Sequence, residues 1–266
     1  MSRTLPFLMA CGLLCAQYPP KVLRITREDI KEGKTVLHEQ SEAKFSQAMA
    51  RHKFPVYYLG LDGMTGTPQA LFMESYESFA SISDAIALED KVAEFGTLST
   101  LDSEYHSGSR VWFAVYRPDL SFHSAEFVAG LPKARYMNVI TVQIHFEHDL
   151  EFAEIAKTAI EAAEKAKSDQ PVAVYQVVSG MPAGTYMLLE AAASLNALDD
   201  APARSRALTQ AMGESGSRKF LKNAGEVIAG EEPLLFAINP KTSYVSKEFA
   251  ADDPEFWTPK PPHKKP

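Results

Sequence analysis

An internal repeat is the feature that most constrains how this chain can fold. The segment YLGLDGM at 58–64 aligns with YQVVSGM at 175–181. Two further pairs of blocks follow in the same order, 71–74 with 187–190 and 113–115 with 236–238. Chance similarity rarely preserves the order of several blocks, so we interpret the chain as two tandem copies of one folding unit.

Each copy predicts the same series of secondary-structure elements, β-α-β-β-α-β, from its hydrophobic periodicity and its turn residues. In the first copy the expected strands are 22–26, 55–61, 69–75 and 111–116, and the expected helices are 32–51 and 76–94. In the second copy the strands are 138–146, 172–179, 185–191 and 234–239, with helices at 150–167 and within 194–229. This order predicts a ferredoxin-like unit, an antiparallel sheet with both helices on one face.

The other face of each predicted sheet is also apolar and needs a partner, which the second copy supplies. We therefore predict an α+β fold in which two tandem ferredoxin-like units pack sheet to sheet as a barrel within one chain. The expected divisions are unit 1 at 21–118, a linker at 119–134, unit 2 at 135–250 and a disordered, Pro-rich tail at 251–266.

The N-terminus has the pattern of a signal peptide. Arg3 precedes an uncharged, apolar run that ends at Ala16, which is too short to span a bilayer. This pattern predicts export, to a compartment such as the periplasm, with residues 1–16 removed. Two alternatives remain open, a lipoprotein anchor on Cys11 and a buried N-terminal strand or helix. Both cysteines, Cys11 and Cys15, lie in this segment, so a mature chain would have no thiol chemistry.

The composition argues against two classes of partner. The formal net charge of −7 disfavours binding to nucleic-acid phosphates and to anionic lipid surfaces. After the N-terminal segment, no apolar run approaches the length of a membrane span. We therefore expect no nucleic-acid partner and no membrane span, whereas further homodimerisation stays open.

The repeat pattern resembles the dimeric α/β-barrel superfamily, which includes the antibiotic-biosynthesis-monooxygenase-like and NIPSNAP-like families. The residues that carry the resemblance are the strands at 22–26 and 57–60, the helix start at 30–34, and the group Glu74, Tyr76 and Phe79 after the hairpin. It covers roughly 21–250 and implies the fold more strongly than a reaction. Members of the superfamily include cofactor-free oxygenases, haem-degrading enzymes and isomerases, and no catalytic motif of theirs matches here.

Six residues are candidates for binding a ligand under the helices. Tyr58 and Tyr175 occupy aligned positions in the second strand of each copy, and Glu74 and Glu190 end the third strands. His38 and His52 lie on the first predicted helix. A tyrosine and a carboxylate on one sheet face could orient a ligand or transfer a proton. The competing interpretation is structural: strand aromatics usually fill a core, and glutamates at strand ends are usually solvated.

The sequence HFEH at 145–148 is the other suggestive cluster. His145 and His148 could converge on a metal only if the strand ends before them, because strand side chains alternate between faces. A polar strand end followed by Asp149 as a helix cap explains the same residues without a metal. We therefore expect no metal site and no cofactor.

Two functional hypotheses of different classes follow. The first is an exported barrel that binds a small apolar or aromatic ligand or serves a structural role, since no catalytic motif is identifiable. The second is a cofactor-independent, monooxygenase-like enzyme or a haem-binding protein, which rests on the resemblance.

Overall fold

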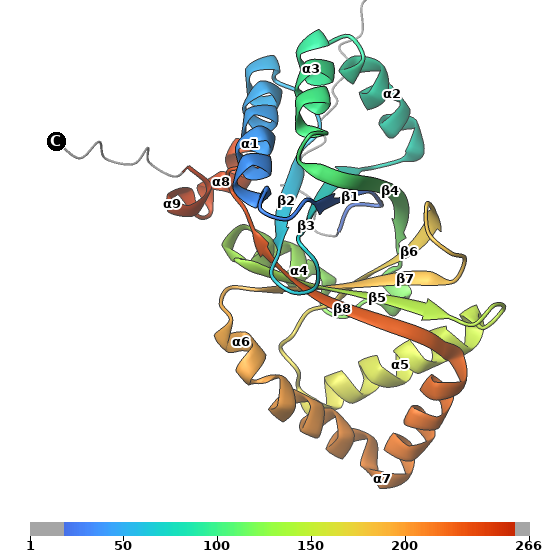
Figure 1. The fold of residues 1–266 in the computed structure, drawn as a ribbon. Coiled ribbons are helices and arrows are strands. Elements are labelled where there is room, and N and C mark those ends of the chain that lie inside the picture. The colour runs from blue at the N-terminus through green and yellow to red at the C-terminus, as the bar shows by residue number, and fades with distance from the viewer. Residues whose placement is uncertain (1–18, 259–266) are drawn as a thin grey trace, which may run out of the picture.

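The computed structural model describes residues 19–258, which form one closed barrel of antiparallel strands (Figure 1). Around the barrel the strands follow the order β1-β3-β2-β8-β5-β7-β6-β4, and β4 pairs with β1 to complete the ring. The predicted α+β class and the barrel are both confirmed.

The first half supplies four neighbouring strands and three helices. Its elements are β1 (Val22–Ile30), α1 (Thr35–His52), β2 (Tyr58–Gly63), β3 (Gln69–Tyr76), α2 (Phe79–Glu89), α3 (Ala93–Asp102) and β4 (His106–Tyr116). The predicted single helix over 76–94 was wrong, because Ser78 caps a new helix that ends before Asp90 and α3 then begins at Ala93. Strands β1 and β4 are longer than predicted, since their polar ends pair with each other.

The second half repeats this order of strands. Its elements are β5 (Tyr136–Ile144), α5 (Asp149–Ala166), β6 (Ala173–Ser179), β7 (Thr185–Ala192), α6 (Asn196–Asp199), α7 (Ala201–Val227) and β8 (Ile228–Ile238). Each half has its first strand between its third and fourth strands. The two sets of strands face each other across the interior and are joined edge to edge by β2–β8 and β4–β6 pairing.

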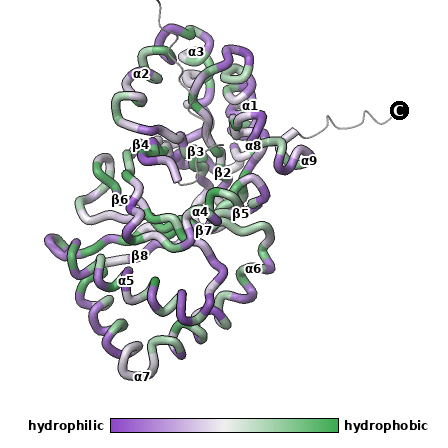
Figure 2. The backbone as a smooth tube through the Cα atoms, turned by 180° about the vertical axis from the view of Figure 1, so that it is seen from behind, coloured by the Kyte–Doolittle hydropathy of each residue, from purple (hydrophilic) through white to green (hydrophobic). Residues whose placement is uncertain are grey.

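Strand alternation divides the apolar residues between the barrel interior and two outer layers. On β1, Leu23 and Ile25 point into the barrel core, whereas Val22 and Ile30 pack on the helix side. Helices α1 to α3 cover the first half of the barrel, and α5 and α7 cover the second half (Figure 1). Hydrophilic residues recur along these outer helices, as expected for helices with one face in solvent (Figure 2).

The segment between the halves is folded rather than extended. It forms the 3-10 turns η1 (Pro118–Leu120) and η2 (Leu131–Lys133) on either side of α4 (Ser124–Gly130). Phe127 and Leu131 belong to the barrel core.

The prediction of a disordered tail was wrong for residues 251–258. Helices α8 (Lys247–Ala251) and α9 (Pro254–Trp257) follow the last strand. Trp257 is buried, and its indole Nε1–H donates a hydrogen bond of 2.7 Å to the Pro132 carbonyl. A buried aromatic with a polar anchor holds this segment against the barrel. Residues 259–266 and the predicted signal peptide at 1–16 lie outside the described residues.

None of the helices within residues 19–258 is both long enough and apolar enough to cross a membrane.

Gly60 on β2 allows a close approach of the segment that follows β8. A Cβ atom at Gly60 would lie 2.4 Å from Thr242 Oγ1 and 2.6 Å from the Thr242 carbonyl oxygen. We expect Gly60→Ala to lower the free energy of unfolding by about 1–3 kcal/mol through overpacking. The control Gly96→Ala lies in α3 with open space around it. It should be stabilising by about 0.5–1 kcal/mol, because alanine favours helix. Urea denaturation measures the free energy of unfolding of both variants. Equal changes in the two variants would contradict the close approach of Thr242 to Gly60.

Candidate functional site

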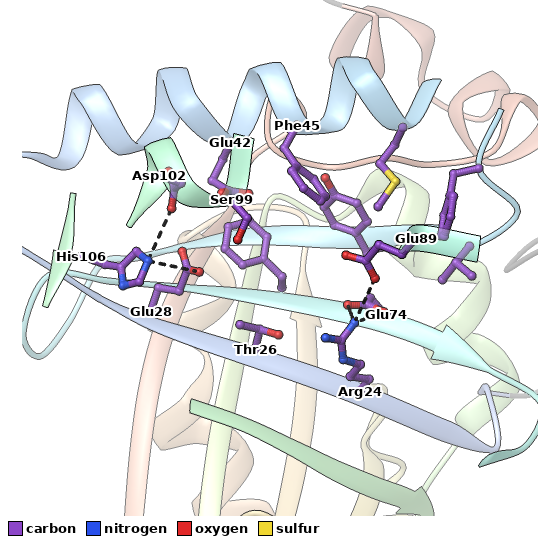
Figure 3. Close-up of a pocket in the computed structure, with 15 residues that line it drawn as sticks. Arg24, Thr26, Glu28, Glu42, Phe45, Glu74, Glu89, Ser99, Asp102 and His106 are labelled. Carbon is purple, nitrogen blue, oxygen red and sulfur yellow. Dashed lines mark hydrogen bonds and ion pairs between the residues drawn. The ribbon is translucent and has the colours of Figure 1, made fainter. Parts of the chain in front are cut away.

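A cavity of about 140 Å³ lies between helices α1 and α3 and the outer face of the sheet in the first half (Figure 3). Glu28, Asp102 and His106 lie at one end of the cavity, and Arg24, Glu74 and Glu89 lie at the other. The remaining lining side chains are Thr26, Glu42, Phe45, Met49, Phe54, Val56, Tyr58, Phe72 and Ser99. The cavity therefore has two polar ends and a largely aromatic middle.

Strand β1 supplies a polar row along the floor of this cavity. Arg24, Thr26 and Glu28 alternate with Leu23 and Ile25, so the polar side chains face the helices while the apolar ones face the barrel core. Polar residues in the middle of a covered strand face are costly unless they are paired.

The Arg24 end is a paired network. Arg24 Nη1 donates to Glu74 Oε1 at 3.1 Å and lies 3.9 Å from Glu89 Oε2. The Tyr76 hydroxyl also donates to Glu74. Burial alone would lower the pKa of Arg24, but the charges of Glu74 and Glu89 outweigh it and raise that pKa. The guanidinium is thus held charged and occupied by its neighbours.

The opposite end gathers carboxylates around an imidazole. We call Glu28, His38, Glu42 and Asp102 the carboxylate–histidine cluster, since one ligand atom from each lies within 4.8 Å of the others. His38 Nε2–H donates to Glu28 Oε2 at 2.8 Å, and the same nitrogen lies 3.7 Å from Asp102 Oδ2. His106 Nε2 adjoins the cluster, 3.8 Å from Asp102 Oδ2.

The cluster holds acidic groups out of water. Burial raises the pKa of Glu42 well above its ordinary value, and the charges of Asp102 and Glu28 raise it further. Burial likewise raises the pKa of Asp102. Burial lowers the pKa of His38, but the hydrogen bond to Glu28 and the charge of Asp102 outweigh it, so the net shift is upward. The cluster favours the neutral form of Glu42 and the cationic form of His38.

Three side chains that line the cavity, Tyr58, Asp102 and His106, have buried polar atoms with unused hydrogen-bonding capacity. His106 Nδ1 has no partner within residues 19–258, and Asp102, which is 4% exposed, has none for either carboxylate oxygen unless a neutral Glu42 donates to it. The Tyr58 hydroxyl, on a residue also 4% exposed, has no partner within the same residues. Unsatisfied buried polar atoms are uncommon in folded proteins, and each needs an explanation.

The structure brings three of the six predicted ligand residues together. Tyr58 and Glu74 line the cavity, and His38 belongs to the carboxylate–histidine cluster. His52 lies elsewhere: its side chain is 41% exposed and its Nε2 lies 2.9 Å from Glu94 Oε2. His52, expected to bind a ligand under the helices, is instead the last residue of α1 and lies beyond the buried residues Ala48 and Met49 of that helix.

The expected equivalence of Tyr58 and Tyr175 was also wrong. Tyr58 packs in the layer under the helices, whereas Tyr175 lies in the barrel interior and donates its hydroxyl to the Pro20 carbonyl at 3.1 Å. The sequence alignment of the two second strands differs from their equivalence in the sheet by an odd number of residues. Because strand side chains alternate between faces, an odd shift places aligned residues on opposite faces of the sheet. Glu190 accepts a hydrogen bond from Asn138 and does not line the cavity.

In the second half only one polar pair, Asn138 and Glu190, occupies the positions that match Arg24 and Glu74 within the described residues. Most of the space between its sheet and helices is occupied by an apolar cluster that includes Phe152, Ile155 and Tyr186.

The HFEH sequence at 145–148 does not build a metal centre. Strand β5 ends at Ile144, and no group of three possible ligands forms around His145 and His148 within the described chain. Asp149 is the first residue of α5 rather than its cap, and it accepts a hydrogen bond from the Tyr186 hydroxyl.

Sequence reasoning missed most of the polar groups of the cavity, namely Arg24, Glu28, Glu42, Asp102 and His106. One signal for them was available: His38 and Glu42 are four residues apart, the spacing that places two side chains on one helical face. Asp102 and His106 have the same spacing, but they span the end of α3 and the start of β4, which the sequence did not locate.

Haem does not fit the cavity. A space of about 140 Å³ is close to the size that holds one benzene ring, and a porphyrin is much larger. His38, the imidazole of the cluster, is already bonded to Glu28. The donor set of carboxylates and imidazole is instead of the kind that binds divalent cations.

The fold is shared with several proteins of known structure. A putative monooxygenase from Fusobacterium nucleatum matches with a TM-score of 0.52 at 12% identity, covering 83% of this chain and 93% of that one. An anthrone oxidase-like protein matches with a TM-score of 0.52 at 8% identity, covering 85% and 94%. A mutant chlorite dismutase from Candidatus Nitrospira defluvii matches with a TM-score of 0.52 at 11% identity, covering 86% and 95%.

These similarities establish the dimeric α/β-barrel type of fold and nothing finer. Neither a protein-family model nor a curated protein matches the sequence. The NIPSNAP-like part of the expected resemblance is not confirmed.

Glu42 generates a pH-dependent prediction. Its pKa is raised in the folded state by burial and by Asp102 and Glu28. The folded protein therefore binds this proton more tightly than the unfolded chain, and its stability falls as the pH rises above the unfolded pKa. Glu42→Gln removes this loss, so we expect the variant to be about 1–3 kcal/mol more stable than the wild type at pH 8 and equal to it near pH 4.

Chemical denaturation at both pH values, in buffer with a chelator, measures the difference. Glu161→Gln, on the exposed side of α5, is the control and should not change the pH profile. A Glu42→Gln profile parallel to that of the wild type would show that Glu42 is ionised in the fold.

Proposed function

We propose that the chain binds a small, neutral or cationic ligand built on one aromatic ring, in the cavity of the first half. The observation that carries this proposal is the buried, unpartnered Tyr58 hydroxyl inside an aromatic cavity. A ligand that brings a hydroxyl or amino group to Tyr58 would satisfy it, and the ring would lie against Phe45 and Phe72.

The size of the cavity limits the ligand to about one ring. A cavity of about 140 Å³ is comparable with an engineered apolar cavity of about 150 Å³ that binds benzene. The aromatic side chains in the middle favour offset or edge-on contact with a ring.

The charges around the cavity exclude an anionic ligand. Both ends contain carboxyl groups, and the guanidinium of Arg24 is already engaged by Glu74. A carboxylate ligand would meet like charges at short range, in a partly desolvated space where they repel strongly. A neutral or cationic group avoids this repulsion.

Three ligands of the same size test the proposal. We expect benzyl alcohol and benzylamine to bind and benzoate not to bind, measured by isothermal titration calorimetry with the full chain in buffer containing a chelator. Ser99→Trp should abolish binding, because Ser99 lines the cavity from an exposed position where a large side chain can enter without disturbing the core.

Thr97→Trp is the matched control, since Thr97 is exposed on the same helix and does not line the cavity. Binding of all three ligands with equal affinity, or unchanged binding by Ser99→Trp, would overturn the proposal.

A second candidate function is proton-transfer catalysis in the same cavity. It is favoured by the position of Glu42, a carboxyl group that lines the cavity and whose pKa burial raises, since such a group can serve as a general acid or base. The shared fold with a putative monooxygenase is compatible with this but does not specify a reaction. Hydrogen–deuterium exchange at the acidic C–H bonds of phenylacetone, followed by NMR, tests it: Glu42→Gln should abolish the exchange and retain binding.

We also propose that the two halves are copies of one ferredoxin-like unit and that the protein is exported. Support for the first comes from the common strand order of the halves and from the block 71–74, which aligns with 187–190 and keeps its apolar residues on the same face of the sheet. Support for the second comes from the apolar run before Ala16. Export predicts that protein recovered from a bacterial periplasm begins at Gln17, which N-terminal sequencing checks, and a chain that begins at Met1 would contradict it.

A further inference from the structure

The carboxylate–histidine cluster has the composition of a metal site. It offers one imidazole nitrogen from His38 and carboxylate oxygens from Glu28, Glu42 and Asp102, all within 4.8 Å of one another. Ligand atoms bound to one divalent cation at about 2.0–2.2 Å are at most about 4.4 Å apart, so the side chains of the cluster would draw together by a few tenths of an ångström around an ion.

The residues of the cluster are held by different elements that the fold fixes in place. His38 and Glu42 lie one turn apart on α1, Glu28 lies on the outer face of β1, and Asp102 ends α3. His38 is 2% exposed and Asp102 is 4% exposed, so their orientation is set by packing and not by solvent. Ligands on rigid elements provide a preorganised site.

An observation independent of the grouping points to a missing partner. When Glu42 is ionised, neither buried carboxylate oxygen of Asp102 accepts a hydrogen bond within the described chain, and the nearest imidazole nitrogens, of His38 and His106, lie 3.7 Å and 3.8 Å away. A proton on Glu42 relieves this by bonding to Asp102, and otherwise a buried carboxylate without a hydrogen-bond donor is strongly unfavourable. A divalent cation at the centre of the cluster would displace the protons of Glu42 and His38 into solvent and would neutralise the carboxylates of Glu28, Glu42 and Asp102.

We propose that the carboxylate–histidine cluster binds one divalent transition-metal ion of the Mn²⁺, Fe²⁺ or Zn²⁺ class. Carboxylate oxygens suit Mn²⁺, and an imidazole extends the choice to Fe²⁺ and Zn²⁺. His106, beside Asp102, lies where it can orient that ligand or add a second nitrogen. The site does not depend on the ring ligand proposed above, which occupies the aromatic middle of the cavity.

Manganese binding to the full chain tests the site. The protein is treated with a chelator, desalted and titrated with Mn²⁺, and the free ion is measured by electron paramagnetic resonance. We expect one Mn²⁺ bound per chain, and pulsed measurements should show coupling to one or more imidazole nitrogens. Because the bound ion stabilises only the folded state, the melting temperature should rise with Mn²⁺ concentration.

Two variants assign the ligands. Asp102→Asn keeps the shape of the side chain and removes its charge, and it should weaken Mn²⁺ binding at least about tenfold. His38→Gln should weaken binding and remove or reduce the nitrogen coupling. His52→Gln is the matched control, because His52 lies on the same helix and pairs with Glu94 in solvent; it should bind Mn²⁺ as the wild type does. Circular dichroism confirms that each variant is folded.

Two results would overturn the proposal. One is the absence of stoichiometric binding of both Mn²⁺ and Zn²⁺ by the folded wild type, and the other is equal binding by Asp102→Asn and the wild type. Failure of the ring-ligand proposal is recognised separately, because calorimetry with benzyl alcohol and benzylamine is performed without metal.

Discussion

Closure of the barrel is the constraint on which the rest of the structure depends. Short stretches of pairing, β2 with β8 and β4 with β6, join the strands of the two halves into one ring. Closure removes the sheet edges that an open four-stranded sheet would expose. It also buries the inner face of both halves in a single core that includes Ile25, Leu61 and Phe236.

Because the core of the barrel is shared, the outer layers of the two halves are free to differ. In the second half the layer under the helices is apolar around Phe152 and Tyr186, and its polar pair, Asn138 and Glu190, is hydrogen-bonded. In the first half the same layer contains the polar row of β1 and the acidic residues of α1 and α3. A stable core allows one outer layer to contain buried charged groups, although those groups lower the stability of the fold. Buried charged groups with perturbed pKa values are concentrated at functional sites.

Two polar regions of the first half have different physical characters. Around Arg24 the charges are paired and hydrogen-bonded, so the polar groups at this end of the cavity need no external partner. Around Asp102 the acidic groups outnumber their cationic neighbours and leave hydrogen-bonding capacity unused. The contrast within one cavity distinguishes a structural ion pair from a group of residues arranged for an external partner.

The sequence by itself determined the α+β class, the order of the strands and the barrel, because apolar periodicity and turn residues are local properties of the sequence. It also named His38, Tyr58 and Glu74 as candidate ligand-binding residues. The tertiary structure alone decided which of these residues meet. Tyr175 aligned with Tyr58 yet faces the barrel interior, because strand register depends on pairing across the sheet.

Glu28, Glu42 and Asp102 likewise come from β1, α1 and α3, and only the packing of those helices on the sheet brings their carboxylates together. No local signal in the sequence specifies that packing, so the acidic end of the cavity became visible only in three dimensions.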